Sequence, residues 1–257
     1  PGALKIFWDV DAPATLAEVR AAPDHPLRRA LEQLDMVLTY GGGEPVVEAY
    51  RFIGARACIP IYNALDPETH HPVPRDPKFA ADLGFLGNRL PDRELRVEQF
   101  FLEPASKLPD QTFLLGGSGW QDKPMSPNIS YIGHVSTRDH NAFNVTPKAV
   151  LNISRASMAE NGFSPATRVF EAAGAGGCLI TDHWEGIELF LKPDDEILVA
   201  RDGRDVAEIL ASLTEERAGE IGRRAMARVL AEHTYTRRAE EVDALFRRHA
   251  QRMEAAE

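Results

Sequence analysis

One stretch of the chain joins a helix to a strand, and it reads Asn161-Gly-Phe-Ser-Pro-Ala-Thr-Arg-Val-Phe-Glu-Ala-Ala-Gly-Ala-Gly-Gly-Cys-Leu-Ile-Thr-Asp182. Pro165 suits the first turn of a helix, where its missing N–H removes no hydrogen bond. The run 174–177 is rich in glycine, which ends helices and allows a tight turn. The apolar residues 178–181 then predict a short buried strand. The stretch therefore predicts a helix over 166–173 and a strand directly after it, as in α/β proteins.

Strand-like and helix-like segments alternate on both sides of this unit. The strand-like segments are uninterrupted apolar runs, which are typical of parallel sheets buried on both faces. They cover residues 4–8, 36–40, 57–61, 83–87, 112–115, 129–132, 149–153, 178–181 and 196–200. Helices are predicted over 26–34, 44–53, 92–102, 166–173 and within the tail 206–253. We therefore predict doubly wound α/β sheets, which bind ligands at the carboxyl ends of their strands.

A proline-rich segment over residues 63–77 interrupts the alternation and is interpreted as an interdomain linker. Its two histidines, His70 and His71, are expected to be solvated. We predict a partial N-terminal Rossmann-like domain with the linker over 1–76, a C-terminal Rossmann-like domain over 77–232 and a C-terminal helix over 233–257. About three strands precede the linker, whereas such a domain usually has six. We therefore expect the N-terminal domain to be incomplete here and residues to precede Pro1.

Composition narrows the classes of partner. The 257 residues carry a net charge of −10, which argues against a nucleic-acid surface because such surfaces are basic. No apolar run approaches the roughly 20 residues of a membrane span. Cys58 and Cys178 lie in apolar runs without metal or redox spacing and are interpreted as reduced core thiols of a cytoplasmic protein. A local phosphate site remains compatible with the acidic composition, because a few arginines and backbone N–H groups suffice.

The stretch over residues 161–182 also resembles a known protein family. Its Arg168-Val-Phe-Glu171-Ala block and its Thr181-Asp182 strand end are similar to the donor-site signature of group 1 glycosyltransferases, and more closely to the CgeB-like branch. The resemblance extends over 82–246, and 233–240 is similar to the closing helix of that family. It implies a GT-B fold, a nucleotide-diphosphate sugar as donor, an unidentified glycosyl acceptor, no metal or other cofactor, and a final helix that braces the first domain.

The residues of this block also suit a phosphate site on physical grounds. Arg168 and Glu171 are three positions apart and therefore share one helix face. The N–H groups of the helix start attract anions. The resemblance implies that Glu171 holds the donor ribose, whereas the alternative is an ordinary surface pair of Arg168 and Glu171.

The chain departs from the family pattern at one position. Many group 1 enzymes have a Glu-x7-Glu pattern, and its first Glu falls on Phe163. Glu160 is near but out of register. The carboxylate near the transferred sugar is therefore absent or supplied from elsewhere, which leaves the stereochemical outcome open.

The predicted donor-binding residues follow strand ends or begin the helix after Pro165. They are Gly87, Asn88, Arg89, Gly119, Trp120, His134, Val135, Asn152, Arg155, Pro165, Ala166, Thr167, Arg168 and Glu171. Three of these predictions have an alternative.

In the loop 87–93, either Arg89 or Arg93 neutralises a phosphate, or the loop is a plain turn with Asp92 as the helix cap. His134 contacts the base or is structural. Arg155 binds the ligand or forms a surface ion pair.

Asp9 and Asp11, after the first strand, are predicted together with Arg168 as catalytic residues. An Asp-x-Asp sequence binds a metal in single-domain glycosyltransferases, but the resemblance places the donor in the second domain, so we predict no metal site. A cleft-facing Asp serves as a base near the acceptor, or Asp11 caps the turn before Pro13. The predicted function is glycosyl transfer. The alternative is a non-catalytic nucleotide-sugar-binding or protein-interaction module, and an epimerase or hydrolase is a third reading.

Overall fold

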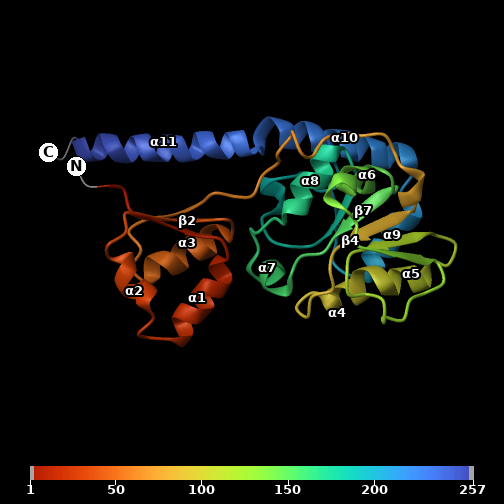
Figure 1. Ribbon diagram of the computed structural model, residues 1–257, viewed down its shortest axis with the longest axis horizontal. Coiled ribbons are helices and arrows are strands. Elements are labelled where there is room, and N and C mark those ends of the chain that lie inside the picture. Colours follow the sequence, from red (N-terminus) through yellow and green to blue (C-terminus); the bar gives the residue numbers. More distant parts are fainter. Residues whose placement is uncertain (1–2, 255–257) are drawn as a thin grey trace.

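The computed structural model describes residues 3–254, with their side chains except those of Ser157 and residues 252–254. It contains two separate parallel sheets (Figure 1). The predicted α/β fold class with parallel sheets is confirmed, because each pairing between neighbouring strands of the two sheets is parallel.

The first sheet has three strands in chain order, β1-β2-β3. Its elements are β1 (Ile6–Asp9), α1 (Ala12–Ala21), α2 (Pro26–Leu31), β2 (Met36–Thr39), α3 (Gly43–Phe52) and β3 (Cys58–Pro60). The three helices cover one face, where Leu16, Leu31 and Val47 pack in one apolar cluster. The sequence pattern missed α1, because only Ala12, Leu16 and Val19 of this helix are buried.

The second sheet has six strands in the order β6-β5-β4-β7-β8-β9. They are β4 (Leu83–Leu86), β5 (Phe113–Gly116), β6 (Ile129–Gly133), β7 (Ala149–Asn152), β8 (Leu179–Asp182) and β9 (Leu198–Ala200). Phe85 of β4 lies between Leu115 of β5 and Leu151 of β7. The chain therefore builds outward from β4, first to one edge and then to the other, which is the arrangement of a Rossmann-like domain.

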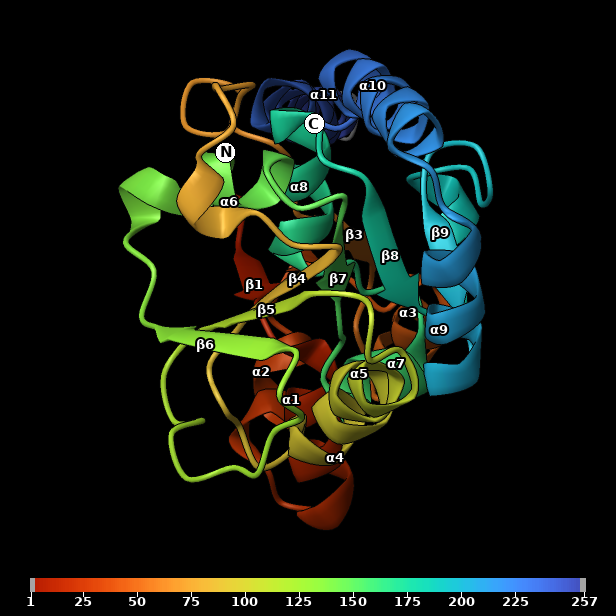
Figure 2. The ribbon, with the colours of Figure 1, turned by 90° about the vertical axis from the view of Figure 1, so that its right-hand side faces the viewer.

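Helices cover both faces of the second sheet (Figure 2). α6 (His140–Val145) and α8 (Thr167–Ala175) pack on one face. On the other face lie α4 (Glu94–Val97), a π-helical turn (Glu98–Leu102), α5 (Glu103–Lys107) and α9 (Gly203–Ser212). α10 (Glu215–Glu232) contributes apolar residues to both cores. The remaining short elements are 3-10 turns at Pro77–Phe79, Thr137–Asp139 and Ile187–Leu189, and α7 (Ala156–Asn161).

The last helix, α11 (Tyr235–Glu254), returns from the second sheet to the first (Figure 1). Val242 and Leu245 of α11 pack against the cluster of Met36, Leu38 and Ile61 on the face of the small sheet opposite α1. Within the described residues, no helix is long and apolar enough to cross a membrane.

The two passages of the chain between the sheets are bonded to each other. Leu65 forms an isolated parallel bridge with Thr234. The Leu65 N–H donates to the His233 carbonyl at 2.7 Å, and the Tyr235 N–H donates to the Leu65 carbonyl at 2.9 Å. Arg238 Nε donates to the Tyr62 carbonyl at 3.2 Å. These bonds join the linker to the turn between α10 and α11.

His233 lies inside this junction. Its side chain is buried near the rings of Phe170 and Phe190. Arg238 Nη2 lies 2.9 Å from His233 Nδ1, so this nitrogen accepts and the ring is neutral. Burial, and then the charge of Arg238, lower the pKa of His233 to about 4. Protonation would place an N–H opposite a guanidinium N–H, which opposes the fold.

We expect the free energy of unfolding to fall as this histidine is forced to ionise. The folded-state pKa of about 4 lies below the ordinary 6.5, so this contribution is complete above pH 6.5 and is lost as the pH falls toward 4. The loss between pH 7.5 and pH 5 is about 2 kcal/mol. Urea unfolding at the two pH values checks this in the native chain and in His233→Gln, which keeps an acceptor for Arg238. An equal pH dependence in both chains would contradict the assignment to His233.

Candidate functional site

A cavity of about 380 Å³ lies at the carboxyl ends of β4 and β7, where the strand order of the large sheet reverses. Doubly wound sheets bind their ligands at this point. We call it the switch-point cavity. Its lining residues come from the strand ends and the loops after them, from α6, α7 and α8, and from the linker: Asn63, Phe85, Leu86, Gly87, Arg93, His140, Asn152, Ile153, Ser154, Arg155, Met158, Ala166, Thr167, Arg168 and Glu171.

Two guanidinium groups of this cavity have no carboxylate partner among the described residues, Arg93 and Arg168. Arg93 Nη2 donates to the Asn88 carbonyl at 2.7 Å, and its guanidinium lies over the Phe85 ring. Arg168 Nη1 donates to Asn144 Oδ1 at 3.3 Å. Burial is the main cause that lowers the pKa of both side chains. The charge of a nearby carboxylate, Asp92 for Arg93 and Glu171 for Arg168, opposes this shift without forming an ion pair, and a neighbouring arginine lowers each pKa further. Both nevertheless stay charged near neutral pH, so an anion bound here would offset their mutual repulsion and their desolvation.

The amino end of α8 borders the same cavity. Ala166 is the N-cap residue and makes no side-chain hydrogen bond to the first amides of the helix, and Thr167 follows it. Pro165 lies at the rim and lines a neighbouring cavity instead. The positive end of the α8 dipole thus adds to the two arginines at one place.

The carboxylate of Glu171 lines the cavity one turn after Arg168. Glu171 Oε1 lies 3.8 Å from His70 Nε2. His70 Nδ1 also lies 3.3 Å from Asn141 Oδ1, and the His70 side chain is only 16% exposed. The expectation that His70 is solvated is therefore wrong, because the linker folds back against α6 and α8; His71 is exposed as expected.

His140 is a cavity residue that the sequence pattern did not single out. Its Nε2 lies 3.3 Å from the Val135 carbonyl. Burial, followed by the charge of Arg168, lowers its pKa. His134, which the sequence suggested, is exposed, and Val135 is buried in the core of the large sheet. The point at which β6 ends and the turn after it decide that His140, and not His134, reaches the cavity.

In the loop after β4, Arg93 and not Arg89 faces the switch-point cavity. Arg89 lies outside the cavity lining and is paired with Glu94 at 2.6 Å and with Asp122 at 2.9 Å. Arg93 takes the position facing the cavity. Asp92 is not the helix cap, because Arg93 precedes the first residue of α4.

Residues of the loop after β5 contact the loop after β4 and hold its shape. The Trp120 indole N–H donates to the Gly87 carbonyl at 2.8 Å, and the side chain is fully buried. Gly119 packs against Arg89, and Asn88 Oδ1 accepts from the Ser118 N–H at 2.9 Å. Trp120 and Gly119 therefore shape the loop and do not line the cavity.

Asn152 and Arg155 follow β7 and both line the cavity. Asn152 Nδ2 donates to Thr181 Oγ1 at 3.0 Å. Arg155 Nε lies 2.5 Å from Asp92 Oδ2, and Arg155 also lines the smaller cavity beside it. Arg155 thus forms the surface ion pair and also faces both cavities, and ligand binding by Arg155 stays a prediction.

The two aspartates at the carboxyl end of β1, Asp9 and Asp11, have different surroundings. Asp9 is buried and turned into the first domain. Its Oδ1 accepts from the Asp11 N–H and from Thr15 Oγ1, each at 3.0 Å, and its Oδ2 accepts from the Tyr50 hydroxyl. Asp9 thus holds the start of α1 in place. Asp11 is exposed and lines a cavity of about 140 Å³ together with Arg155 and Pro165.

The smaller cavity adjoins the switch-point cavity, because Asn63, Arg155 and Met158 line both. Residues after β1 and β2 therefore face the start of α8 across a common space. Within residues 3–254, no three His, Cys, Asp or Glu side chains are grouped closely enough to hold a metal ion.

Solved structures with the same architecture are glycosyltransferases of the GT-B fold. HepE from Anabaena in complex with UDP-glucose superposes with a TM-score of 0.64 at 14% identity, over 93% of this chain and 71% of that one. Sucrose-phosphate synthase from Thermosynechococcus elongatus gives a TM-score of 0.69 at 15% identity, over 98% and 68%. BGT of T4 phage with UDP-glucose gives 0.58 at 12%, over 93% and 72%. The two parallel sheets and the cavity between them thus define a GT-B protein.

Family membership follows from the sequence. A family described as glycosyl transferase-like matches residues 93–244, which is more than half of the chain. The chain belongs to this glycosyl transferase-like family. No match was found among curated protein sequences.

Proposed function

We propose that this protein, as a member of the CgeB-like branch, transfers a sugar from a nucleotide-diphosphate sugar to the hydroxyl group of an acceptor. The observation that carries the proposal is the pair of guanidinium groups, Arg93 and Arg168, that face the switch-point cavity without a carboxylate partner in the described part of the chain. A diphosphate supplies the missing negative charge. The complexes of HepE and of the T4 phage protein with UDP-glucose support a donor of this class.

The proposed chemistry is stabilisation of the leaving group. The bond between the anomeric carbon and the diphosphate oxygen breaks, and the electron pair leaves with the diphosphate. In this proposal Arg93, Arg168 and the first amides of α8 stabilise this charge, and their position around the cavity supports it. These fixed positive groups take the role that a metal ion plays in other glycosyltransferases, so we propose that the transfer needs no metal.

The acceptor side of the proposal rests on Asp11. Its carboxylate lies in the smaller cavity opposite the start of α8. The acceptor oxygen forms the new bond to the anomeric carbon, and its proton passes to the Asp11 carboxylate. Asp9 is unsuited to this role because three protein donors already occupy its oxygens.

Glu171 is proposed to hold the ribose of the donor. Replacing Glu171 by Gln is expected to raise the dissociation constant for UDP about tenfold, because a carboxylate accepts hydrogen bonds from a diol more strongly than an amide does. Binding of inorganic pyrophosphate, which has no ribose, is expected to stay unchanged. Calorimetric titration of both ligands checks this. An equal loss for both would show that Glu171 acts only by holding His70 or Arg168 in place.

One observation favours the alternative of a non-catalytic binding module. Phe163 stands where the family pattern has a Glu, and its φ of 46° is unusual for a non-glycine residue. Its ring touches Gly43 and Gly186 so closely that a Cβ at either position would overlap it. Its carbonyl accepts from the Gly42 N–H at 2.8 Å. Phe163 thus joins the two domains by packing and offers no carboxylate to the sugar.

A two-stage assay separates these functions. Thermal unfolding with UDP, GDP, TDP and ADP sugars is expected to show a selective rise in midpoint for a transferase and for a binding module alike. Release of the free nucleoside diphosphate that depends on an added acceptor pool is expected only for the transferase. Release without acceptor would indicate a hydrolase. No shift with any nucleotide sugar would refute both donor-binding functions.

A further inference from the structure

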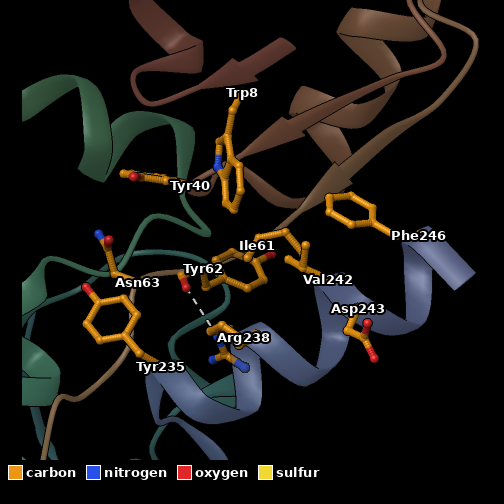
Figure 3. Close-up of a pocket in the computed structure, with 11 residues that line it drawn as sticks. Trp8, Tyr40, Ile61, Tyr62, Asn63, Tyr235, Arg238, Val242, Asp243 and Phe246 are labelled. Atoms are coloured by element: carbon orange, nitrogen blue, oxygen red, sulfur yellow. Dashed lines mark hydrogen bonds between the residues drawn. The ribbon is translucent and has the colours of Figure 1, made fainter. Parts of the chain in front are cut away.

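Another cavity, of about 610 Å³, lies between the small sheet and α11 (Figure 3). Trp8 of β1, Tyr40 after β2 and Tyr62 after β3 form one wall, and Tyr235 and Phe246 of α11 form the other. We call this the aromatic groove. Its size falls within the range of small-molecule sites, roughly 300 to 1,000 Å³. Neither the donor site nor the proposed transfer step uses it.

The aromatic groove gathers large apolar side chains that remain open to solvent. Trp8 is 43% exposed, Tyr40 40%, Tyr235 47% and Phe246 37%. The Trp8 and Tyr40 rings pack edge to face, with their centroids 6.2 Å apart, which fixes their orientation. Exposed apolar side chains that cluster in one hollow mark a surface that another apolar group covers.

The charged residue at the centre of the groove has its hydrogen bonds satisfied by the protein. Arg238 donates to the Tyr62 carbonyl, approaches His233 Nδ1 and pairs with Glu241 at 2.8 Å. Only about 8% of Arg238 is exposed. The other polar groups of the lining are Asn63, Asp243, which pairs with Arg247 at 2.7 Å, and the hydroxyl groups of three tyrosines. Most of the lining surface is nevertheless apolar, so the groove suits a planar or alkyl group.

The groove is continuous with the proposed reaction site. Tyr40 and Asn63 line both the aromatic groove and the smaller cavity that contains Asp11. Asn63 also lines the switch-point cavity. A molecule seated against the aromatic rings can thus extend a hydroxyl group past Tyr40 toward Asp11 and the donor.

We propose that the aromatic groove binds the apolar part of the acceptor, an aromatic or alkyl group that carries the hydroxyl to be glycosylated. This inference rests on the proposed function and assigns the chemical class of its acceptor. The aromatic rings of β1 and α11 hold the apolar part, and the hydroxyl group lies at the Asp11 end.

Calorimetric titration with 2-naphthol, an aromatic molecule with one hydroxyl group, tests the assignment. We expect saturable binding to the native chain and a dissociation constant at least about tenfold higher in Ala239→Phe, because the added ring fills the groove. Ala239 is exposed on α11, so the larger side chain displaces no core residue. Tyr235→Ala, which removes part of the wall, is expected to weaken binding as well.

Phe52→Ala is the matched control, since Phe52 is 91% exposed on α3 and lies outside the groove. It is expected to leave 2-naphthol binding unchanged. Absence of saturable binding, insensitivity to both groove variants, or binding of glucose that these variants abolish would overturn the proposal. UDP binding by Ala239→Phe is measured in parallel and is expected to be native. A native chain that binds 2-naphthol but not UDP would refute the proposed donor site and leave the groove proposal standing.

Discussion

Replacing Arg168 by alanine is expected to weaken binding of UDP roughly ten- to a hundredfold. The guanidinium is buried beside Arg93 and has no carboxylate partner in the described structure, so a bound diphosphate is its natural counter-charge. A hydrogen bond to a charged group is worth about 1.5 to 3 kcal/mol, which corresponds to this range. Calorimetric titration of UDP measures the effect directly, and Arg93→Ala is expected to act in the same direction.

Arg89→Ala is the matched control for these variants. Arg89 belongs to the same loop as Arg93 but is paired with Glu94 and Asp122 outside the cavity. It is expected to leave UDP affinity within about twofold, because its guanidinium lies outside the cavity lining and is already paired with two carboxylates. Arg168→Lys is expected to restore part of the affinity, since it keeps the charge and loses the two-pronged geometry. Native affinity in Arg168→Ala would show that the diphosphate binds elsewhere.

The second large effect concerns the packing of α10 on α8. Gly222 lies in the middle of α10, and a Cβ there would stand 2.2 Å from the carbonyl oxygen of Gly176, the residue that ends α8. Gly222→Ala is therefore expected to lower the free energy of unfolding by about 3 kcal/mol, because a backbone oxygen cannot move aside as a side chain can. Urea unfolding measures this change.

Gly219→Ala in the same helix is expected to have the opposite sign. Its added Cβ meets only the mobile end of Arg223 at 3.3 Å. Alanine is the better helix former, so this variant is expected to be more stable by up to about 1 kcal/mol. A similar effect of both substitutions would mean that helix propensity, and not the contact with Gly176, decides stability at Gly222.

Five strands were predictable because all of their residues are buried: β2, β4, β5, β7 and β8. The edge strands β1, β3, β6 and β9 are only partly buried, but their apolar residues still indicated them. Some residues of the switch-point cavity were predictable from the topology, although His140 was not. Asn152, Arg155, Arg168 and Glu171 face it because they follow strand ends or begin the next helix.

The inward or outward direction of individual side chains could not be predicted. Arg89 turns outward because Asp122, 33 positions away, holds it there. Asp9 turns inward because Tyr50 and Thr15 donate to it, and nothing in the spacing of Asp9 and Asp11 shows which carboxylate does so. His70 lies against Glu171 although its own segment has the composition of a solvated linker.

The bonded junction between Leu65 and Thr234 has a mechanical consequence. The polypeptide crosses between the two domains twice, first in the linker and again just before α11. Hydrogen bonds join these two passages side by side. Because both passages are joined at this junction, we expect any opening of the two domains to be a rotation about it. Sliding of one domain past the other would distort both passages at once and strain the backbone hydrogen bonds between them.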